Sequence, residues 1–339
     1  MKKILVTGGA GFIGSHTVVE LQQRGYEVFI VDNLSNSNPD VIDNIAKITD
    51  IKPVFGKVDV ACKDELFDFL KHHPGIESVI HFAASKAVGE SVEQPLKYYR
   101  NNINGLINVL EAMKEFGIKN LVFSSSCTVY GQPEKLPVTE NSPIQPALSP
   151  YGNTKQINEE IIHDFIAVNK GFNSICLRYF NPIGAHPSGL IGELPIGVPA
   201  NLIPYITQTA AGIRECLSVF GNDYNTPDGT PIRDYIDIVD LANAHIAAIN
   251  RMEQGKQKSA LEFFNVGTGN GLTVLQLISA FEKATGVKLN YKIVGRRAGD
   301  IEKVWANTDL ANKELGWKAQ VPIEETLRNA WRWQQKLAQ

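Results

Sequence analysis

Cysteine is scarce in this chain of 339 residues, which contains only four. Cys62, Cys127, Cys176 and Cys216 are far apart and form no Cys-x-x-Cys pair, so the sequence indicates neither a zinc site nor a redox motif. Scattered cysteines in a long chain are typical of reduced core residues. We therefore expect a cytoplasmic protein.

A strong excess of charge is also absent, since the formal net charge is −3. The sequence thus offers no basic surface for nucleic acid. No apolar run reaches the roughly 18 residues that a membrane-spanning helix needs. Histidines do not cluster, and we interpret His163 and His245 as helix residues rather than ligands. We expect no nucleic-acid partner, no membrane span and no metal.

The first half of the chain alternates short apolar runs with longer amphipathic segments. Continuous apolar runs of this kind fit strands that are buried on both faces of a parallel sheet. The expected strands cover residues 4–7, 28–32, 79–83, 121–125 and 174–180, and helices are expected over 13–24 and 98–116. This alternation predicts an α/β fold with a doubly wound parallel sheet of the Rossmann type.

Three glycines, Gly8, Gly11 and Gly14, lie between the first expected strand and the first expected helix. In such a loop the first glycine permits a tight turn, the second lets the backbone approach a pyrophosphate, and the third lets helix and strand pack closely. Asp32 ends the second strand, where a carboxylate accepts hydrogen bonds from the adenosine ribose. The alternative is an aspartate that serves only the following turn. Together these features predict a site for NAD rather than NADP.

The pattern changes after Asn181, where Gly and Pro become frequent over residues 182–204 and 221–231. We predict an NAD-binding domain over residues 1–180 and a smaller C-terminal α/β substrate domain mainly over 181–339. A helix over 236–252 and a strand over 263–267 are expected to return to the first domain, so that return segments lie near 236–267.

Tyr151 and Lys155 share one face at the start of an expected helix, because residues four apart lie one turn above each other. An ammonium beside a phenol favours the phenolate, so we expect a lowered pKa for Tyr151 and a general base. Ser126 follows the strand over 121–125, and its hydroxyl can bind the oxygen that Tyr151 deprotonates. The alternative for the Tyr–Lys pair is a solvated surface pair.

These three residues and the glycine loop resemble the extended short-chain dehydrogenase/reductase superfamily. Further segments resemble one family within it, the UDP-galactose (UDP-glucose) 4-epimerases, from about Ile4 to Trp333. The segments that carry this resemblance cover residues 7–16, 79–91, 123–131, 177–189, 220–224 and 233–236.

The resemblance implies a bound NAD, a UDP-hexose substrate and roles for individual residues. Around NAD it implies Gly8, Gly11, Phe12, Ile13, Asp32, Asn33, Asn36, Ser37, Asp59, Val60, Phe82, Ala83, Lys86, Asn101, Tyr151, Lys155 and Phe180. Around the UDP-sugar it implies Ser126, Tyr151, Asn181, Asn201, Leu202, Phe220, Arg233, Arg297 and Asp300. Two alternatives stay open: Asp59 could cap the next helix, and Arg233 and Arg297 could be surface arginines.

The implied reaction is transient oxidation at C4 of the sugar, with Ser126, Tyr151 and Lys155 as catalytic residues. Dehydratases of the superfamily carry an acid pair where this chain has Cys127 and Thr128, so elimination of water is not expected. Another nucleotide-sugar epimerase, or an NAD-binding regulatory protein without catalysis, is the alternative. The regulatory protein is disfavoured because both Tyr151 and Lys155 are present.

Two further expectations concern the sugar and the assembly. The family carries a tyrosine or a small residue at the position of Val304, and the small residue leaves room for an acetamido group. We therefore predict that N-acetylated UDP-hexoses are also substrates, unless Val304 belongs to the core. In the family, helices such as those over 98–116 and 154–168 form a homodimer, so the resemblance implies a dimer here. The first helix has an apolar stripe, which could face a partner subunit or only the sheet: Ile103, Leu106, Val109, Leu110 and Met113.

Overall fold

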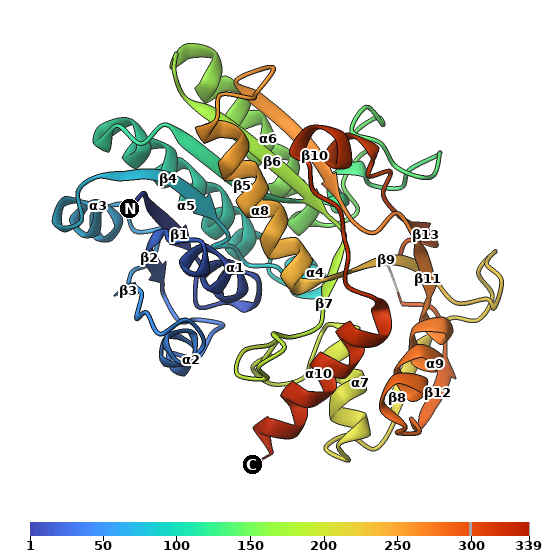
Figure 1. Ribbon diagram of the computed structural model, residues 1–339. Helices are drawn as coiled ribbons and strands as arrows, with labels where there is room; N and C mark the ends of the chain where they lie inside the picture. Colours follow the sequence, from blue (N-terminus) through green and yellow to red (C-terminus); the bar gives the residue numbers. More distant parts are fainter. Residues whose placement is uncertain (298–299, 339) are drawn as a thin grey trace.

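A seven-stranded parallel sheet forms the centre of the larger part of the molecule, in a computed structural model that describes residues 1–297 and 300–338 (Figure 1). The strand order is β10-β6-β5-β4-β1-β2-β3, and every neighbouring pair is parallel. The strands are β1 (Lys3–Thr7), β2 (Glu27–Asp32), β3 (Val54–Lys57), β4 (Ile76–His81), β5 (Asn120–Ser126), β6 (Asn173–Tyr179) and β10 (Leu261–Val266). The predicted fold class is confirmed.

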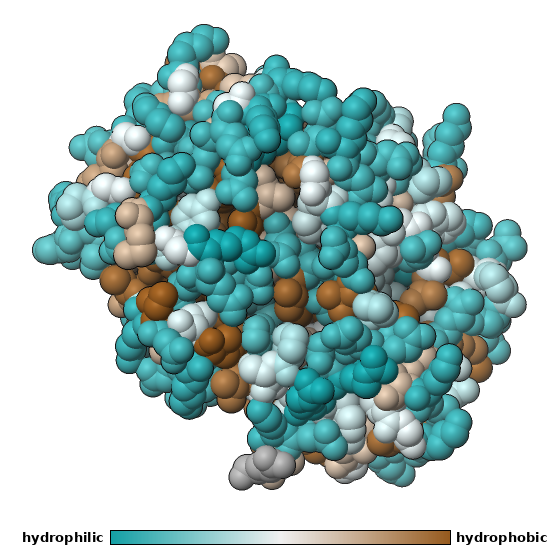
Figure 2. All heavy atoms as spheres, viewed as in Figure 1, coloured by the Kyte–Doolittle hydropathy of each residue, from teal (hydrophilic) through white to brown (hydrophobic). Residues whose placement is uncertain are grey.

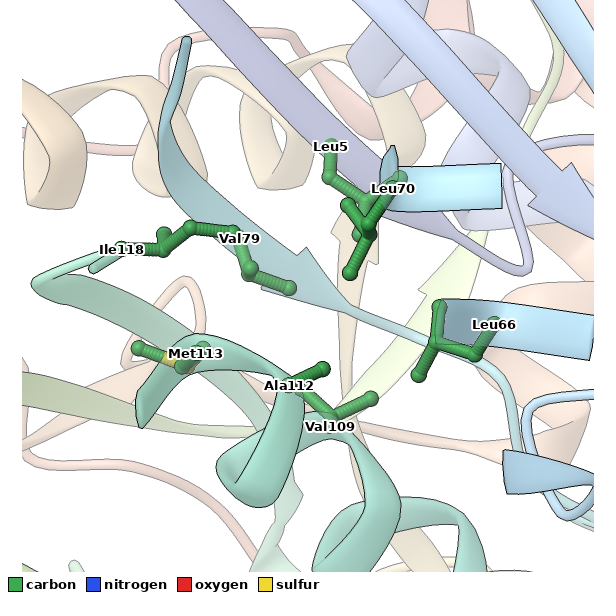
Figure 3. A pocket seen from close by; sticks show the side chains of 8 residues that line it. All are labelled: Leu5, Leu66, Leu70, Val79, Val109, Ala112, Met113 and Ile118. Carbon is green, nitrogen blue, oxygen red and sulfur yellow. The ribbon is translucent and has the colours of Figure 1, made fainter. Parts of the chain in front are cut away.

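Helices cover both faces of this sheet, which explains why its strands are apolar throughout. One face packs against α1 (Phe12–Gln23), α2 (Asp40–Thr49) and α8 (Ile238–Glu253). The other packs against α3 (Lys63–His72), α5 (Pro95–Phe116) and α6 (Pro150–Val168). Figure 3 shows the second core between β1, β4, α3 and α5, where these side chains converge: Leu5, Leu66, Leu70, Val79, Val109, Ala112, Met113 and Ile118.

The strand order reverses at β1, since β2 and β3 lie on one side of it and β4, β5, β6 and β10 lie on the other. In open parallel sheets, ligands bind outside the carboxyl ends of the strands at such a switch point. The glycine loop follows β1 there, and Ser126 ends β5 on the same edge. The short α4 (Val88–Glu93) and the 3₁₀ turn η1 (Cys127–Tyr130) also follow strands at this edge.

Smaller sheets and three helices form the rest of the molecule, at the lower right of Figure 1. The strand β9 (Ile232–Asp237) pairs with β7 (Asn181–Ile183), β11 (Gly271–Thr273) and β13 (Lys303–Val304), and β8 (Leu217–Phe220) pairs with β12 (Tyr291–Val294). The helices are α7 (Leu202–Ala210), α9 (Val274–Thr285) and α10 (Ile323–Leu337). The π-helical turn η2 (Ala311–Leu315) lies instead against α8 and β10 of the larger part. A separate apolar core joins these three helices to β7, β8 and β9.

Two later segments do return to the large sheet. The helix α8 packs against α1, and β10 pairs with β6 from Leu261↔Ser174 to Val266↔Tyr179. The division of the chain near residue 180 stays a prediction.

The face of the molecule shown in Figure 2 is mainly hydrophilic, with small apolar patches. Within residues 1–297 and 300–338, no helix combines the length and the apolar character that crossing a membrane requires.

Candidate active site

The glycine loop brings backbone close to backbone, as the sequence predicts. A Cβ on Gly8 would lie 2.7 Å from the backbone nitrogen of Ala83, and one on Gly14 would lie 2.2 Å from the carbonyl oxygen of Gly8. Gly8 also has a φ of +70°, which disfavours any side chain. By contrast, Gly11 has only the Gly8 oxygen nearby, at 3.2 Å. Gly11 is the N-cap of α1 and offers no side chain to the first turn, so this end suits an anion.

Asp32 lies beside this loop at the end of β2 and is buried. Its Oδ2 accepts a hydrogen bond from the backbone of Ala10 at 3.1 Å, which fixes the carboxylate against the glycine loop. Its Oδ1 accepts from the Leu34 backbone at 2.9 Å and the Ser37 hydroxyl at 3.0 Å. The carboxylate therefore serves the turn, as the alternative held, and also borders the predicted cofactor site.

Asp59 does not cap the next helix, because the N-cap of α3 is Cys62. Its Oδ2 accepts a hydrogen bond from the Asn33 side chain at 3.2 Å, so two of the residues predicted to bind NAD contact each other. The other residues predicted for NAD line the same edge at varied depth. Val60 and Phe180 are buried, Phe12, Ile13, Phe82, Ala83 and Asn101 are half-buried, and Asn36 is exposed.

Tyr151 and Lys155 lie in the first turns of α6, which begins at a strong signal. The Ser149 hydroxyl accepts a hydrogen bond from the Gly152 backbone at 3.1 Å, and Pro150 occupies the first helical position. Lys155 is only 3% exposed and its ammonium donates to the Ser124 carbonyl at 2.5 Å. The pair is therefore not on the surface. The Lys155 nitrogen lies 5.8 Å from the centre of the Tyr151 ring.

Burial dominates the electrostatics of these two residues. Desolvation raises the pKa of Tyr151 to about 12, although the neighbouring Ser126 hydroxyl lowers it. Desolvation also lowers the pKa of Lys155 to about 8, opposed by the negative charge of Glu159. Among the protein's own residues the pKa of Tyr151 is therefore raised, and the expected lowering is wrong. The spacing of two residues in the sequence shows that they are neighbours, but it does not show how deeply they are buried.

Two arginines predicted to bind the UDP-sugar meet around one carboxylate. Asp300 Oδ1 lies 2.6 Å from Arg297 Nη2 and 3.8 Å from Arg233 Nη2. The Arg233 side chain is 16% exposed and therefore not a surface arginine, whereas that of Arg297 is 57% exposed. The Arg297 guanidinium also lies 5.8 Å from the centre of the Phe220 ring. Asp300 thus brings together two arginines, one of them exposed, and paired guanidinium groups are suited to binding a diphosphate.

Val304 lies next to this cluster, since its register partner on β9 is Arg233. Its side chain is 3% exposed and belongs to a small core with Tyr130 and Phe180. This burial agrees with the alternative of a core valine. The acceptance of N-acetylated sugars stays a prediction.

Two acidic residues that the sequence analysis did not single out organise the site. Glu193 Oε1 accepts from Lys86 at 3.0 Å and from Asn201 at 2.6 Å, and so joins a predicted cofactor residue to a predicted substrate residue. Asp234 is fully buried and accepts from the backbones of Thr268, Gly269 and Ala306. Asp234 therefore locks β9, which carries Arg233, to the loop after β10 and to the segment after β13.

The remaining predicted substrate residues lie along the same side of the molecule. Asn181 begins β7 and is the register partner of Tyr235 on β9. Asn201 is the exposed N-cap of α7, and Leu202 is its half-buried first residue. A group of three metal-ligating side chains does not occur within residues 1–297 and 300–338.

Comparison with known proteins decides the family. The model of the GDP-mannose 4,6 dehydratase family matches residues 5–330. UDP-glucose 4-epimerase of Bos taurus is 49% identical over 99% of this chain and 97% of its own length. The chain belongs to the first family and, within it, to the UDP-glucose 4-epimerases. The resemblance identified from the motifs is thereby confirmed.

Two other relatives extend the match. The bifunctional protein GAL10 of Pachysolen tannophilus is 52% identical over 99% of this chain, which spans 49% of the length of that protein. The crystal structure of the Stenotrophomonas maltophila enzyme, with bound NAD and formylated UDP-arabinopyranose, is 46% identical. It superposes with a TM-score of 0.96 and covers 100% of this chain and 99% of its own.

Proposed function

We propose that this chain interconverts UDP-galactose and UDP-glucose by transient oxidation at C4 of the sugar, with NAD held as a resident cofactor. One observation carries this proposal: Ser126, Tyr151 and Lys155 lie at the carboxyl edge of the sheet that also bears the glycine loop. A hydroxyl, a phenol and an ammonium at this edge suit removal of a proton from a carbinol.

The residues of the NAD site fit the cofactor. Gly11 leaves an approach open at the N-terminus of α1, and Asp32 lies fixed at the end of β2. When NAD is bound, it supplies a hydride acceptor and a positive ring charge close to the catalytic residues. A positive charge near Tyr151 acts against the desolvation that raises the pKa of the phenol.

The chain's own residues move the proton and hold the substrate. Tyr151 accepts the proton of the sugar 4-hydroxyl, and Ser126 shares a hydrogen bond with the same oxygen. Lys155 stabilises the negative charge that Tyr151 must carry. Arg233 and Arg297 bind the diphosphate, which leaves the oxidised sugar free to turn over between proton removal and proton return.

The surroundings of Ser126 disfavour elimination of water. Burial raises the pKa of the Cys127 thiol to about 12, and the next side chain is the hydroxyl of Thr128. Neither group is an effective acid near neutral pH, whereas expelling a hydroxyl needs one. Epimerisation without elimination is the reaction that this site supports.

The test is an incubation of the purified protein with UDP-galactose after gel filtration, without added NAD. We expect UDP-glucose to form, because each cycle returns the hydride that it takes. Stoichiometric consumption of external NAD, with accumulation of NADH, would instead mean a dehydrogenase.

We also propose a homodimer and a cytoplasmic location. The predicted stripe does not support the dimer, because Leu106, Val109, Leu110 and Met113 pack against the chain's own sheet. Support comes from the outer side of the adjacent α5 and α6, where Ile103 and Ile157 are half-buried and Ile107 is exposed. Light scattering tests the dimer: wild type should have the mass of two chains, and Ile107→Asp should have the mass of one. The four free cysteines favour a reducing location.

A further inference from the structure

A buried ion pair lies directly behind the catalytic residues. Arg178 on β6 donates to both carboxylate oxygens of Glu159 on α6, from Nε at 2.9 Å and from Nη2 at 2.6 Å. Their side chains are 6% and 8% exposed. The desolvation of such a pair offsets much of its Coulomb attraction, so its presence is weak evidence for a role in stability alone.

Glu159 and Lys155 dock on consecutive residues of the strand that ends in the catalytic serine. Lys155 donates to the Ser124 carbonyl at 2.5 Å, and the Ser125 hydroxyl donates to Glu159 Oε1 at 2.6 Å. The two side chains are one helical turn apart on the same face of α6. Glu159 therefore places a full negative charge one turn behind the ammonium and holds α6 in register with β5.

We propose that Glu159 is a positioning residue of the catalytic centre, whose buried carboxylate keeps the Lys155 ammonium charged and fixed beside Tyr151. This inference rests on the proposed epimerase function. Without Glu159, burial would favour the neutral amine, which cannot stabilise a phenolate.

The other titratable groups around Lys155 do not supply this charge. His81 on β4 is neutral, since burial lowers its pKa to about 3. Cys176 on β6 is a neutral thiol, since burial raises its pKa. Tyr151 on α6 and Tyr179 on β6 are phenols whose pKa values burial also raises. Glu159 is the anion that opposes the desolvation of Lys155.

The test compares Glu159→Gln with a matched variant far from the site. Arg251 and Glu262 form a second buried pair, with contacts of 2.6 and 2.9 Å and exposures of 5% and 9%. Glu262→Gln therefore removes one carboxylate from a similarly buried arginine, although Glu314 stays 3.4 Å from Arg251. For wild type and each variant, kcat is measured against pH on the NAD-loaded enzyme, and the melting temperature is measured over the same pH range.

In wild type we expect kcat to fall as the pH rises through about 8, the pKa of Lys155, and we call this fall the limb of the pH profile. In Glu159→Gln this limb should move to lower pH by about one unit, the order expected when a unit charge one helical turn away is removed. Glu262→Gln should leave the limb in place, and Glu159→Asp should restore most of it. A folded Glu159→Gln enzyme with an unmoved limb would overturn the proposal.

The melting temperatures give a reading that does not depend on activity. The pKa of Lys155 falls from its usual 10.5 to about 8 in the folded chain, so stability rises with pH between these values. In Glu159→Gln this window should extend below pH 8, and melting should fall more steeply from pH 8 to pH 7 than in Glu262→Gln. Equal changes of melting temperature with pH in the two variants would contradict the role of Glu159, whether or not wild type is active. Absence of epimerase activity in wild type would instead refute the proposed function.

If Glu159→Gln does not fold, Glu159→Gln/Arg178→Met replaces both charges by neutral side chains, a change that buried pairs often tolerate. The limb should still move to lower pH in this double variant, but by less than in Glu159→Gln, because the opposing charge of Arg178 is removed as well. A wild-type profile in the double variant would show that the pair acts only in folding.

Discussion

The glycine loop permits a prediction in which two neighbouring alanine substitutions fail for different reasons. A Cβ on Gly14 would lie 2.2 Å from the Gly8 oxygen and 2.8 Å from the Gly9 Cα, both backbone atoms that cannot rotate away. Gly14→Ala must therefore push α1 away from the loop. Overpacking of this kind costs about 1–3 kcal/mol, or roughly 1–4 °C in melting temperature for a chain of this size.

Gly11→Ala should behave differently, because its nearest neighbour is one oxygen at 3.2 Å. We expect a loss of at most about 1 kcal/mol, the usual penalty for alanine at an N-cap. The added methyl group would stand where the backbone approaches the pyrophosphate. Bound NAD should therefore fall by about tenfold or more, which corresponds to roughly 1.4 kcal/mol of binding free energy.

The assay measures NAD released from the denatured protein, together with thermal unfolding of the same samples. Gly89→Ala is the control, since Gly89 lies in α4 and has no atom within 4 Å of an added Cβ. It should keep its NAD and melt at or slightly above the wild-type temperature. A Gly11→Ala protein with a full complement of NAD would refute the assignment of this loop to the pyrophosphate.

Three further predictions address the other parts of the site. Tyr151→Phe should fold and retain NAD but lose about 10² or more in kcat, and near-normal turnover would exclude Tyr151 as the base. Asp300→Asn should raise KM for UDP-galactose with little effect on NAD content, because Asp300 holds Arg297 at 2.6 Å; an unchanged KM would show that Asp300 does not position the arginine. Wild type should turn over UDP-N-acetylgalactosamine, and absence of turnover by folded wild type would disprove the prediction. Val304→Tyr should overpack the small core around this buried residue, so its activity on both sugars is compared together with its melting temperature.

Most strands of the large sheet could be predicted because their signal is local. Short apolar runs between amphipathic segments identify β1, β2, β4, β5 and β6, and they differ from the predicted ranges by only a few residues. The glycine spacing likewise depends on a turn, a close approach and a helix start that adjoin in the chain. Such features need no knowledge of distant residues.

The electrostatics of the site could not be predicted, because burial depends on the whole fold. The spacing of Tyr151 and Lys155 correctly predicts that they are neighbours, but desolvation raises the pKa of the phenol instead of lowering it. The stripe on α5 shows the same limit, since periodicity identifies an apolar face but not what covers it. Glu193 lies in a segment rich in Gly and Pro, and its partners Lys86 and Asn201 come from opposite sides of the site.

The pairing of β10 with β6 has a consequence for the order in which the molecule is made. Residues 174–179 receive their outer neighbour only when residues 261–266 have been synthesised, and α1 is covered by α8 from the same late stretch. A nascent chain that has reached residue 180 would expose an unpaired strand edge and an uncovered apolar helix face, both of which favour aggregation. Residues 1–180 should therefore mature only after residues 261–266 have left the ribosome, and a fragment cut at residue 180 should not be recoverable as a soluble NAD-binding protein.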